Sequence, residues 1–443
     1  MSLDRSRLPS AARAGEEMHA LMRKLYPLCR SLTGDGVRRT LELIERDVPL
    51  ERTQVATRTQ VYDWTLPREW NIRGARLTGP GGDVIADFAD SNLHVLGYSV
   101  PVKGSFSLEE LRPHLFTDPG RPQVIPYRTS YHNENWGFCL PHAVYEGLPE
   151  GDYEVEIDST LEDGHVVYAE RFLRGESEDE VLISTYVCHP SLCNDNLSGV
   201  VLTAALARYL DGQSLRRSYR FLFGPATIGP LTWLSRNEER LPRITAGLVA
   251  TCVGDPGPFT YKRTRRGNAE IDRAAAVLLR GEGLEDFSPL GTDERQFCSP
   301  GFDLPVGVLS RTPPDRFAEY HSSADDLDFV QPAALGESFE RYLDLIEILE
   351  RNRVYRNLSP KGEPQLGKRG LYRSVGGGSF TEAPLLWMLN LSDGSNDLLA
   401  VAERSALPFG EIADAADALL EAGLLSAAEQ TEEPVPRPDQ PSS

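Results

Sequence analysis

Strand-like apolar runs alternate with helical segments through residues 152–352, and this alternation constrains the fold more than any other feature. The strand-like runs are EVLISTYVCH (180–189), YRFLFGP (219–225), ITAGLVATCVGD (244–255) and LPVGVLS (304–310). The helical runs are LSGVVLTAALARYL (197–210), PLTWLSRNEERL (230–241), NAEIDRAAAVLLR (268–280) and ALGESFERYLDLIEILERN (334–352). This alternation of strands and helices predicts an α/β fold with helices on both faces of a mixed or parallel sheet. Functional residues are then expected on loops at the carboxyl ends of the strands.

The segment before this region predicts a second domain, as expected for a chain of 443 residues. Residues 16–46 have helical spacing, whereas short alternating runs with Gly, Pro and Asp turns then predict a small β-rich module. Its segment YRTSYHNENWGF is either a wall of a substrate pocket or a set of aromatic side chains that fills a small core. We expect one discontinuous domain from residues 1–57 and 152–352, with a β-rich domain inserted at 58–151.

The C-terminal region predicts a third domain. A Pro- and Gly-rich arm leads into three short helices between residues 385 and 425, which predicts a winged-helix domain at 353–429. Acidic residues outnumber basic ones in these helices, which favours packing or self-association into a homo-oligomer over DNA binding. Residues 430–443 have the composition of a disordered tail.

Composition excludes several classes of partner. The formal net charge is −20, from 46 basic and 66 acidic residues, which argues against a nucleic-acid partner. No uninterrupted apolar run approaches the roughly 18 residues that a membrane span needs, and the first 17 residues lack the apolar stretch of a leader. The six cysteines are sparse and form no CxxC motif, which is typical of reduced cytosolic thiols. We therefore expect a cytoplasmic protein without a membrane partner.

Four of the predicted strand-end loops carry side chains that can bind metal ions. The candidates are His189 and Asp195 in CHPSLCNDNLSG, Asp255 in CVGDPG, Asp293 and Glu294 in LGTDERQF, and His321 in AEYHSSADDL. Imidazole together with carboxylate is the ligand set of catalytic zinc. The chain has only eight histidines, so two of them on strand-end loops of one domain favour a shared site.

Several of these motifs resemble those of known enzymes. NDNLSG is similar to the DN-x-SG motif of the co-catalytic zinc aminopeptidases, and HSSADDL resembles their last ligand motif. More closely, the chain resembles a bacterial aminopeptidase-like family associated with polysaccharide and natural-product biosynthesis. LYPLCRSLTGDGVR, SNLHV, YRTSY, CHPSLCNDNLSG, DERQFCSPG and EYHSSAD carry this resemblance over roughly residues 16–330, and LNLSDG extends it into the winged helix.

The resemblance implies a zinc-aminopeptidase-like fold and a hydrolase that cleaves a peptide or a small aminoacyl amide. Its metal positions fall on His189, Asp195, Asp255 and His321, where one or two Zn²⁺ ions would bind and Asp195 would bridge a pair. Ser191 departs from the family pattern, because the aminopeptidases usually carry Asp at that position.

A second departure concerns the general base. In GPATIGP, Ala226 stands where the resemblance implies a glutamate, and Thr227 stands where a second glutamate ligand is expected. A positioned carboxylate that moves a proton in hydrolysis contributes about 10²–10⁴-fold to the rate, and alanine cannot do this. Either the chain is an inactivated variant, or it is a natural pseudoenzyme, or another acid such as Glu294 substitutes. The missing second glutamate makes a single zinc ion an alternative to two.

The substrate-binding candidates include a basic cluster in an otherwise acidic chain. Lys262, Arg265 and Arg266 in YKRTRRG either hold a carboxylate or phosphate of the substrate or only neutralise acidic neighbours. Asp293 and Tyr320 lie next to other candidate site residues and are expected to contact the substrate as well.

Two functions other than a zinc hydrolase also fit the sequence. One is a non-catalytic binding or assembly protein on an aminopeptidase fold, which Ala226 would fit. The other is a zinc acyltransferase or cyclase, because glutaminyl cyclases resemble the same fold. Metal content separates the first rival from an enzyme, since a degenerate binding protein has little reason to retain tight zinc.

Overall fold

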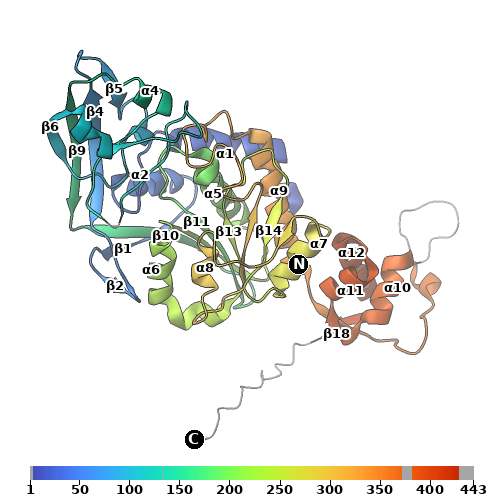
Figure 1. Ribbon diagram of the computed structural model, residues 1–443. Coiled ribbons are helices and arrows are strands. Elements are labelled where there is room, and N and C mark those ends of the chain that lie inside the picture. Colours follow the sequence, from blue (N-terminus) through green and yellow to red (C-terminus); the bar gives the residue numbers. More distant parts are fainter. Residues whose placement is uncertain (1–2, 132, 372–381, 429–443) are drawn as a thin grey trace, which may run out of the picture. The chain divides into compact units, whose positions relative to one another are not determined.

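The computed structural model describes residues 3–131, 133–371 and 382–428 (Figure 1). The chain forms two compact units, Met1–Leu345 and Ile346–Ser443. The boundary between them falls inside helix α9 (Pro332–Arg351), a few residues before the boundary predicted at residue 352. The predicted tail at 430–443 lies outside the described residues.

An eight-stranded mixed sheet forms the centre of the first unit. Its strands, in spatial order, are β1 (Glu51–Ala56), β10 (His165–Leu173), β12 (Ser218–Gly224), β11 (Glu180–Tyr186), β13 (Ile244–Ala250), β16 (Val306–Ser310), β14 (Thr260–Lys262) and β15 (Leu284–Glu285). The four central strands, from β12 to β16, are parallel, whereas β10 and β14 run antiparallel to their central neighbours. Every residue of β11 and β12 is buried, as expected of strands that helices cover on both faces. The predicted α/β class is confirmed.

Helices cover both faces of this sheet (Figure 1). On one face lie α1 (Ala11–Leu25), α5 (Gly199–Leu210) and α9, and on the other lie α6 (Ile228–Asn237), α7 (Glu270–Leu278) and the short α8 (Glu294–Phe297). The second N-terminal helix is α2 (Asp35–Ile44). Helix α5 is almost entirely buried, because only Arg208 of its residues is exposed. Helices α1 and α9 pack closely: a side chain on Gly15 would collide with the carbonyl oxygen of Pro332.

The inserted module is a four-stranded antiparallel sheet in the order β5 (Val84–Asp87), β4 (Glu69–Thr78), β9 (Asp152–Glu162), β6 (Val102–Ser107). It also holds the hairpin β2 (Gln60–Val61) and β3 (Trp64–Thr65), the pair β7 (Leu115–Phe116) and β8 (Phe138–Cys139), and helices α3 (Leu108–Leu111) and α4 (His142–Glu146). The predicted end of the module at residue 151 is wrong, because β9 pairs with β4 and β6. Its alternating burial is typical of a sheet with one solvated face, and the main sheet resumes only at β10.

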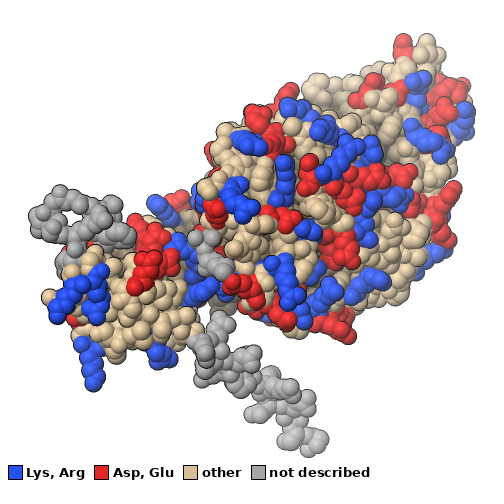
Figure 2. All heavy atoms as spheres, turned by 180° about the vertical axis from the view of Figure 1, so that it is seen from behind, with Lys and Arg blue, Asp and Glu red and all other residues tan. Residues whose placement is uncertain are grey.

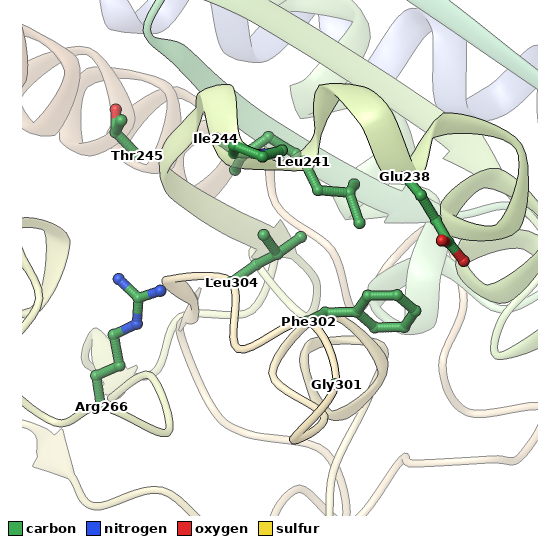
Figure 3. A pocket seen from close by; sticks show the side chains of 9 residues that line it. Glu238, Leu241, Ile244, Thr245, Arg266, Gly301, Phe302 and Leu304 are labelled. Carbon is green, nitrogen blue, oxygen red and sulfur yellow. The ribbon is translucent and has the colours of Figure 1, made fainter. Parts of the chain in front are cut away.

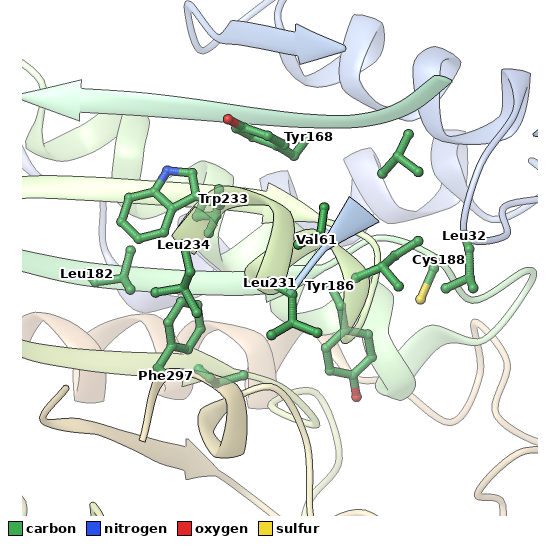
Figure 4. Close-up of a cluster of buried hydrophobic side chains, with 14 of the residues drawn as sticks. Leu32, Val61, Tyr168, Leu182, Tyr186, Cys188, Leu231, Trp233, Leu234 and Phe297 are labelled. Atoms are coloured by element: carbon green, nitrogen blue, oxygen red, sulfur yellow. The ribbon is translucent and has the colours of Figure 1, made fainter. Parts of the chain in front are cut away.

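The module and the main sheet share one apolar cluster. In it, Leu32, Trp70 and Tyr98 pack together with Tyr186 and Cys188 from the end of β11 and the loop that follows it. Figure 4 shows part of this cluster, including Trp233 of α6 and Phe297 of α8. The shared core fixes the module against the carboxyl end of β11, where the first candidate ligand, His189, follows.

The second unit has the predicted winged-helix architecture. Its helices α10 (Glu382–Leu391), α11 (Leu398–Ser405) and α12 (Phe409–Glu421) accompany a three-stranded antiparallel sheet in the order β18 (Asp393–Asp397), β17 (Val354–Asn357), β19 (Leu425–Ala427). The Asp397 side chain caps α11 by accepting from the N–H of Ala400.

The surface carries both signs of charge. On the face in Figure 2, Lys and Arg side chains are interspersed with Asp and Glu. Among the described residues, no helix has both the length and the apolar character needed to cross a membrane.

Candidate metal centre

Three of the four predicted ligands converge beyond the carboxyl ends of the central strands. His189 follows β11, Asp195 lies in the segment Cys193–Ser198 that leads into α5, and His321 lies in the loop after β16. Their potential ligand atoms all lie within 4.8 Å of one another. Both imidazoles approach the same oxygen: Asp195 Oδ2 lies 2.9 Å from His321 Nε2 and 3.8 Å from His189 Nε2.

The polar atoms at this point are buried but unsatisfied. Neither Asp195 Oδ2 nor His321 Nε2 has a hydrogen-bond partner of acceptable geometry, despite their 2.9 Å separation. Buried polar atoms without partners are costly and rare in folded proteins. Two imidazole nitrogens and one carboxylate oxygen are a donor set that suits zinc. These three residues therefore fit a divalent ion.

The protonation states also suit metal binding. Burial opposes ionisation of Asp195, but the neighbouring His189 and His321 and the Tyr186 hydroxyl hold its pKa at about 2. Burial lowers the pKa of His189 to about 4, against the opposing effect of Asp195. At neutral pH the carboxylate is therefore charged and this imidazole is neutral, as ligands must be.

Aromatic rings enclose the two histidines. Tyr320 stacks on His321 with ring centroids 3.9 Å apart and an interplanar angle of 11°. Tyr127, from the inserted module, lies edge-on to His321 at 5.1 Å, lies 5.2 Å from the His189 ring, and donates its backbone N–H to the carbonyl of His321. Tyr127 of the YRTSY segment therefore lies against both candidate ligand rings, whereas Tyr131 packs against the apolar core. That this segment forms a wall of a substrate pocket stays a prediction. Tyr320 was also an expected substrate contact, and the structure places it directly on a ligand ring.

Two buried residues that the sequence analysis did not single out as site residues hold the ligand loops. Asp325 accepts the backbone N–H groups of Asn194 at 2.5 Å and Asp195 at 2.9 Å, one on each carboxylate oxygen. Arg30 donates through Nε to the carbonyl of His189 at 2.9 Å. Asp325 lies in the HSSADDL motif and Arg30 in LYPLCRSLTGDGVR, but sequence alone assigned neither contact.

Asp255 is not part of this cluster, contrary to the prediction. Its carboxylate accepts from the Asn194 side chain at 3.0 Å, from the Gly257 N–H at 2.8 Å, and from both the N–H and the hydroxyl of Thr312. Asp255 lies five residues after β13 ends at Ala250, and its loop turns the carboxylate toward Thr312. It ties two loops together and has no free oxygen directed at the histidines.

Position 226 lies beside the first ligand. The backbone N–H of Ala226 donates to Cys188 Sγ, one residue before His189, and the N–H of Thr227 donates to Asp293 Oδ1 at 2.7 Å. Asp293 is buried, and its second oxygen, Oδ2, has no partner. The proposed substitute acid Glu294 is engaged elsewhere, since it pairs with Lys262 Nζ at 2.7 Å and accepts from Thr292.

The basic cluster is divided between two places. Lys262 and Glu294 line a cavity of about 320 Å³ together with Asp315 and Arg316. Arg265 and Arg266 instead pair with Asp303, which lies before β16. Because β14 runs antiparallel to β16, the residues that follow β14 are carried to the opposite edge of the sheet from the histidines. The prediction that Arg265 and Arg266 contact the substrate at this site therefore conflicts with the structure.

A larger cavity also lies away from the ligands. It measures about 480 Å³ and is lined by Ile244 and Thr245 at the start of β13, by Leu304 before β16, and by Phe302 and Arg266 (Figure 3). These residues mark the amino ends of the parallel strands, whereas the candidate metal centre lies beyond their carboxyl ends.

Asp293 makes the stability of the folded chain depend on pH. Burial, with a smaller effect of Glu294, raises its pKa from 3.8 to about 7. The folded state therefore keeps a proton that the unfolded chain releases, and this contribution to the unfolding free energy falls as pH rises from about 4 to 7. We expect Asp293→Asn to gain roughly 2–4 kcal/mol relative to the parent chain between pH 4 and pH 8. Thermal unfolding with a chelator present measures this, and a stability difference independent of pH would contradict it.

The fold and the site together define an aminopeptidase-like α/β protein with a C-terminal winged helix. Residues 19–352 match a family described as a domain of unknown function (DUF4910), and residues 353–427 match a winged helix-turn-helix family. The chain belongs to the DUF4910 family.

Similar proteins place this family among the aminopeptidase-like folds. A Clostridium acetobutylicum protein described as a candidate polysaccharide biosynthesis protein with an aminopeptidase-like domain is 50% identical over 425 residues, which cover 94% of this chain and 98% of the relative. A crystal structure from the same organism, described as a candidate peptidase, superposes with a TM-score of 0.90 at 49% identity, covering 94% and 97% of the two chains. A zinc aminopeptidase of Bacillus subtilis superposes with a TM-score of 0.55 at 12% identity, covering 76% of this chain and 95% of that one, which shows a shared fold.

Proposed function

We propose that this protein is a zinc-dependent amide or peptide hydrolase of aminopeptidase type, acting in polysaccharide or natural-product biosynthesis. The observation that carries the proposal is the convergence of His189, Asp195 and His321 on one buried point where Asp195 Oδ2 and His321 Nε2 lack partners. The aminopeptidase-like fold supports the reaction class, and the description of the Clostridium relative supports the biosynthetic setting.

The residues around that point have distinct tasks. A bound zinc ion would supply Lewis acidity toward a substrate carbonyl. Tyr127 and Tyr320 enclose the His321 ring and limit the access of water to it. Asp325 and Arg30 hold the loops of Asp195 and His189 in place.

In this proposal the cavity of about 320 Å³ lined by Lys262 and Glu294 binds the side chain of the substrate's amino acid. Tyr320 stacks on His321 and lies five residues after Asp315, which lines the cavity. Burial raises the pKa of the Tyr320 hydroxyl, and the charges of both Asp195 and Asp315 raise it further.

A hydrolase also needs a side chain that takes up and releases a proton. Ala226 has no carboxylate, and Glu294 is held by Lys262. Asp293 is the better substitute, because its Oδ2 is unpartnered and its Oδ1 binds the backbone next to Ala226. Its pKa of about 7, raised by burial, suits a group that must take up and release a proton near neutral pH.

The alanine at position 226 equally favours a second candidate, a non-catalytic binding protein on the same fold. Zinc content measured by mass spectrometry, on full-length protein purified without added metal, tests the proposed function. We expect the protein to carry zinc and to regain it after chelation. If the purified protein contains no zinc and takes none up, the hydrolase function is contradicted and the non-catalytic binding protein is the remaining candidate.

A further inference from the structure

The two carboxylate oxygens of Asp195 have different environments. Oδ2 faces both histidines and has no hydrogen-bond partner. Oδ1 accepts a hydrogen bond from the hydroxyl of Tyr186, the last residue of β11. In a carboxylate that bridges two cations each ion usually takes one oxygen, and in Asp195 the Tyr186 hydroxyl already binds Oδ1.

The group on Oδ1 is part of a buried hydroxyl pair. Tyr186 Oη lies 2.8 Å from Thr251 Oγ1, and Thr251 is the first residue after β13. The phenol donates its one proton to Asp195 Oδ1, and Thr251 Oγ1 lies within hydrogen-bonding distance of the phenol oxygen. Tyr186 and Thr251 are both buried, and Figure 4 shows the Tyr186 hydroxyl directed away from the labelled apolar side chains. The Tyr186 hydroxyl therefore lies against Oδ1, with the Thr251 hydroxyl behind it.

A second cation would have no further ligands there. Zinc binds carboxylate oxygen at about 2.0–2.2 Å, and paired catalytic metals lie about 3.5–4 Å apart. Within the described part of the chain, only His189, Asp195 and His321 form a potential ligand cluster. Asp255 is fully occupied by Asn194, Gly257 and Thr312.

We propose that this centre binds one divalent ion, on the Oδ2 side of Asp195, and that the Tyr186–Thr251 hydroxyl pair occupies the place of a second ion. Tyr186 is then a positioning residue: its hydrogen bond to Oδ1 turns Oδ2 toward His189 and His321. The inference rests on the proposed function in that a metal ion must bind at all.

A single ion changes how a substrate is held. With two cations, one can take the substrate carbonyl and the other a free amine. The hydroxyls of Tyr186 and Thr251 lie on the Oδ1 side, so a substrate amine would depend on hydrogen bonds rather than on a second cation. The centre should therefore select less strongly for a free amino terminus than a two-metal site does.

Cobalt(II) titration of the chelated full-length protein, followed by visible absorption, tests the stoichiometry without relying on activity. Zinc titration by calorimetry provides the second reading. We expect one tight equivalent of either metal. Two tight equivalents would overturn the one-ion inference while leaving the hydrolase proposal standing, and no binding would remove both.

The positioning role of Tyr186 is tested by Tyr186→Phe. We expect one equivalent of zinc to bind still, with about 10- to 100-fold weaker affinity, the usual cost of losing a hydrogen bond to a metal ligand. Tyr342→Phe is the matched control, because Tyr342 is also buried and donates one hydrogen bond, to Leu309, away from the ligands. Unchanged zinc affinity in Tyr186→Phe, or an equal loss in Tyr342→Phe, would overturn the role.

Discussion

Replacing Asp195 with asparagine should abolish stoichiometric zinc binding. Asp195 supplies the only carboxylate of the cluster, and its Oδ2 lies between the two imidazoles. The substitution keeps the size of the side chain but removes the charge that offsets the cation. We expect the affinity to fall by more than about 100-fold, because removing a group that merely supports a ligand already costs about 10–100-fold. Competition with a chromogenic chelator measures this, and His321→Ala should behave in the same way.

The control is a histidine outside the cluster. His94 lies in the inserted module and its Nδ1 is paired with the carbonyl of Cys139, so His94→Ala should keep zinc at the parental affinity. If Asp195→Asn also kept that affinity, zinc would have to bind elsewhere on the chain, and the assignment of His189, Asp195 and His321 would be wrong.

Much of the first unit is visible in local sequence patterns. EVLISTY in β11 is a strand buried on both faces, and its neighbours β12, β13 and β16 are similarly apolar. His189 lies three residues after β11, so its place at this edge of the sheet follows from the strand pattern. His321 lies eleven residues after β16, and it was paired with His189 through the resemblance of HSSADDL to a ligand motif. The same patterns placed the three helices of the winged-helix unit.

The predictions from sequence are wrong where the direction of a strand or the length of a loop decides where a side chain lies. Asp255 lies five residues past the end of β13, and the number of loop residues between a strand and its site is not encoded in apolar periodicity. Arg265 and Arg266 follow a short strand, β14, whose antiparallel direction cannot be inferred from three residues. In contrast, the strict alternation in DYEVEIDS was a usable signal that β9 belongs to the one-sided sheet of the module.

The role of Tyr186 could not be predicted from the sequence for a different reason. In the sequence it is one more apolar residue of a buried strand, and its ring does pack in the apolar cluster. Only the direction of its hydroxyl, toward Asp195, makes it part of the metal centre. A tyrosine can pack its ring in an apolar core and also bind a polar group through its hydroxyl. A pattern of buried residues therefore does not show whether a tyrosine belongs to the core, to the metal centre or to both.

Introducing a carboxylate at position 226 should raise amide hydrolysis, by at most about 10²–10⁴-fold, because in the proposed function Asp293 already acts as a base in the parent chain. Ala226 is joined through its N–H to Cys188, next to His189, so a longer side chain there starts beside the first ligand. Asp293, bound to the adjacent Thr227, offers an unpartnered Oδ2 with which a glutamic acid could share a proton. We expect Ala226→Glu to hydrolyse members of a panel of aminoacyl amides and p-nitroanilides faster than the parent chain does.

Ala226→Gln separates proton transfer from packing. Glutamine matches glutamate in size and can reach Asp293, but it cannot take up a proton, so its rates should stay near those of the parent chain. The gain in Ala226→Glu should also be lost in Asp195→Asn, because a carboxylate at position 226 acts on a substrate that the metal centre must hold. A zinc-loaded Ala226→Glu protein with no gain on any substrate of the panel would favour the non-catalytic binding protein, in which the cluster of His189, Asp195 and His321 holds a metal without using it for hydrolysis.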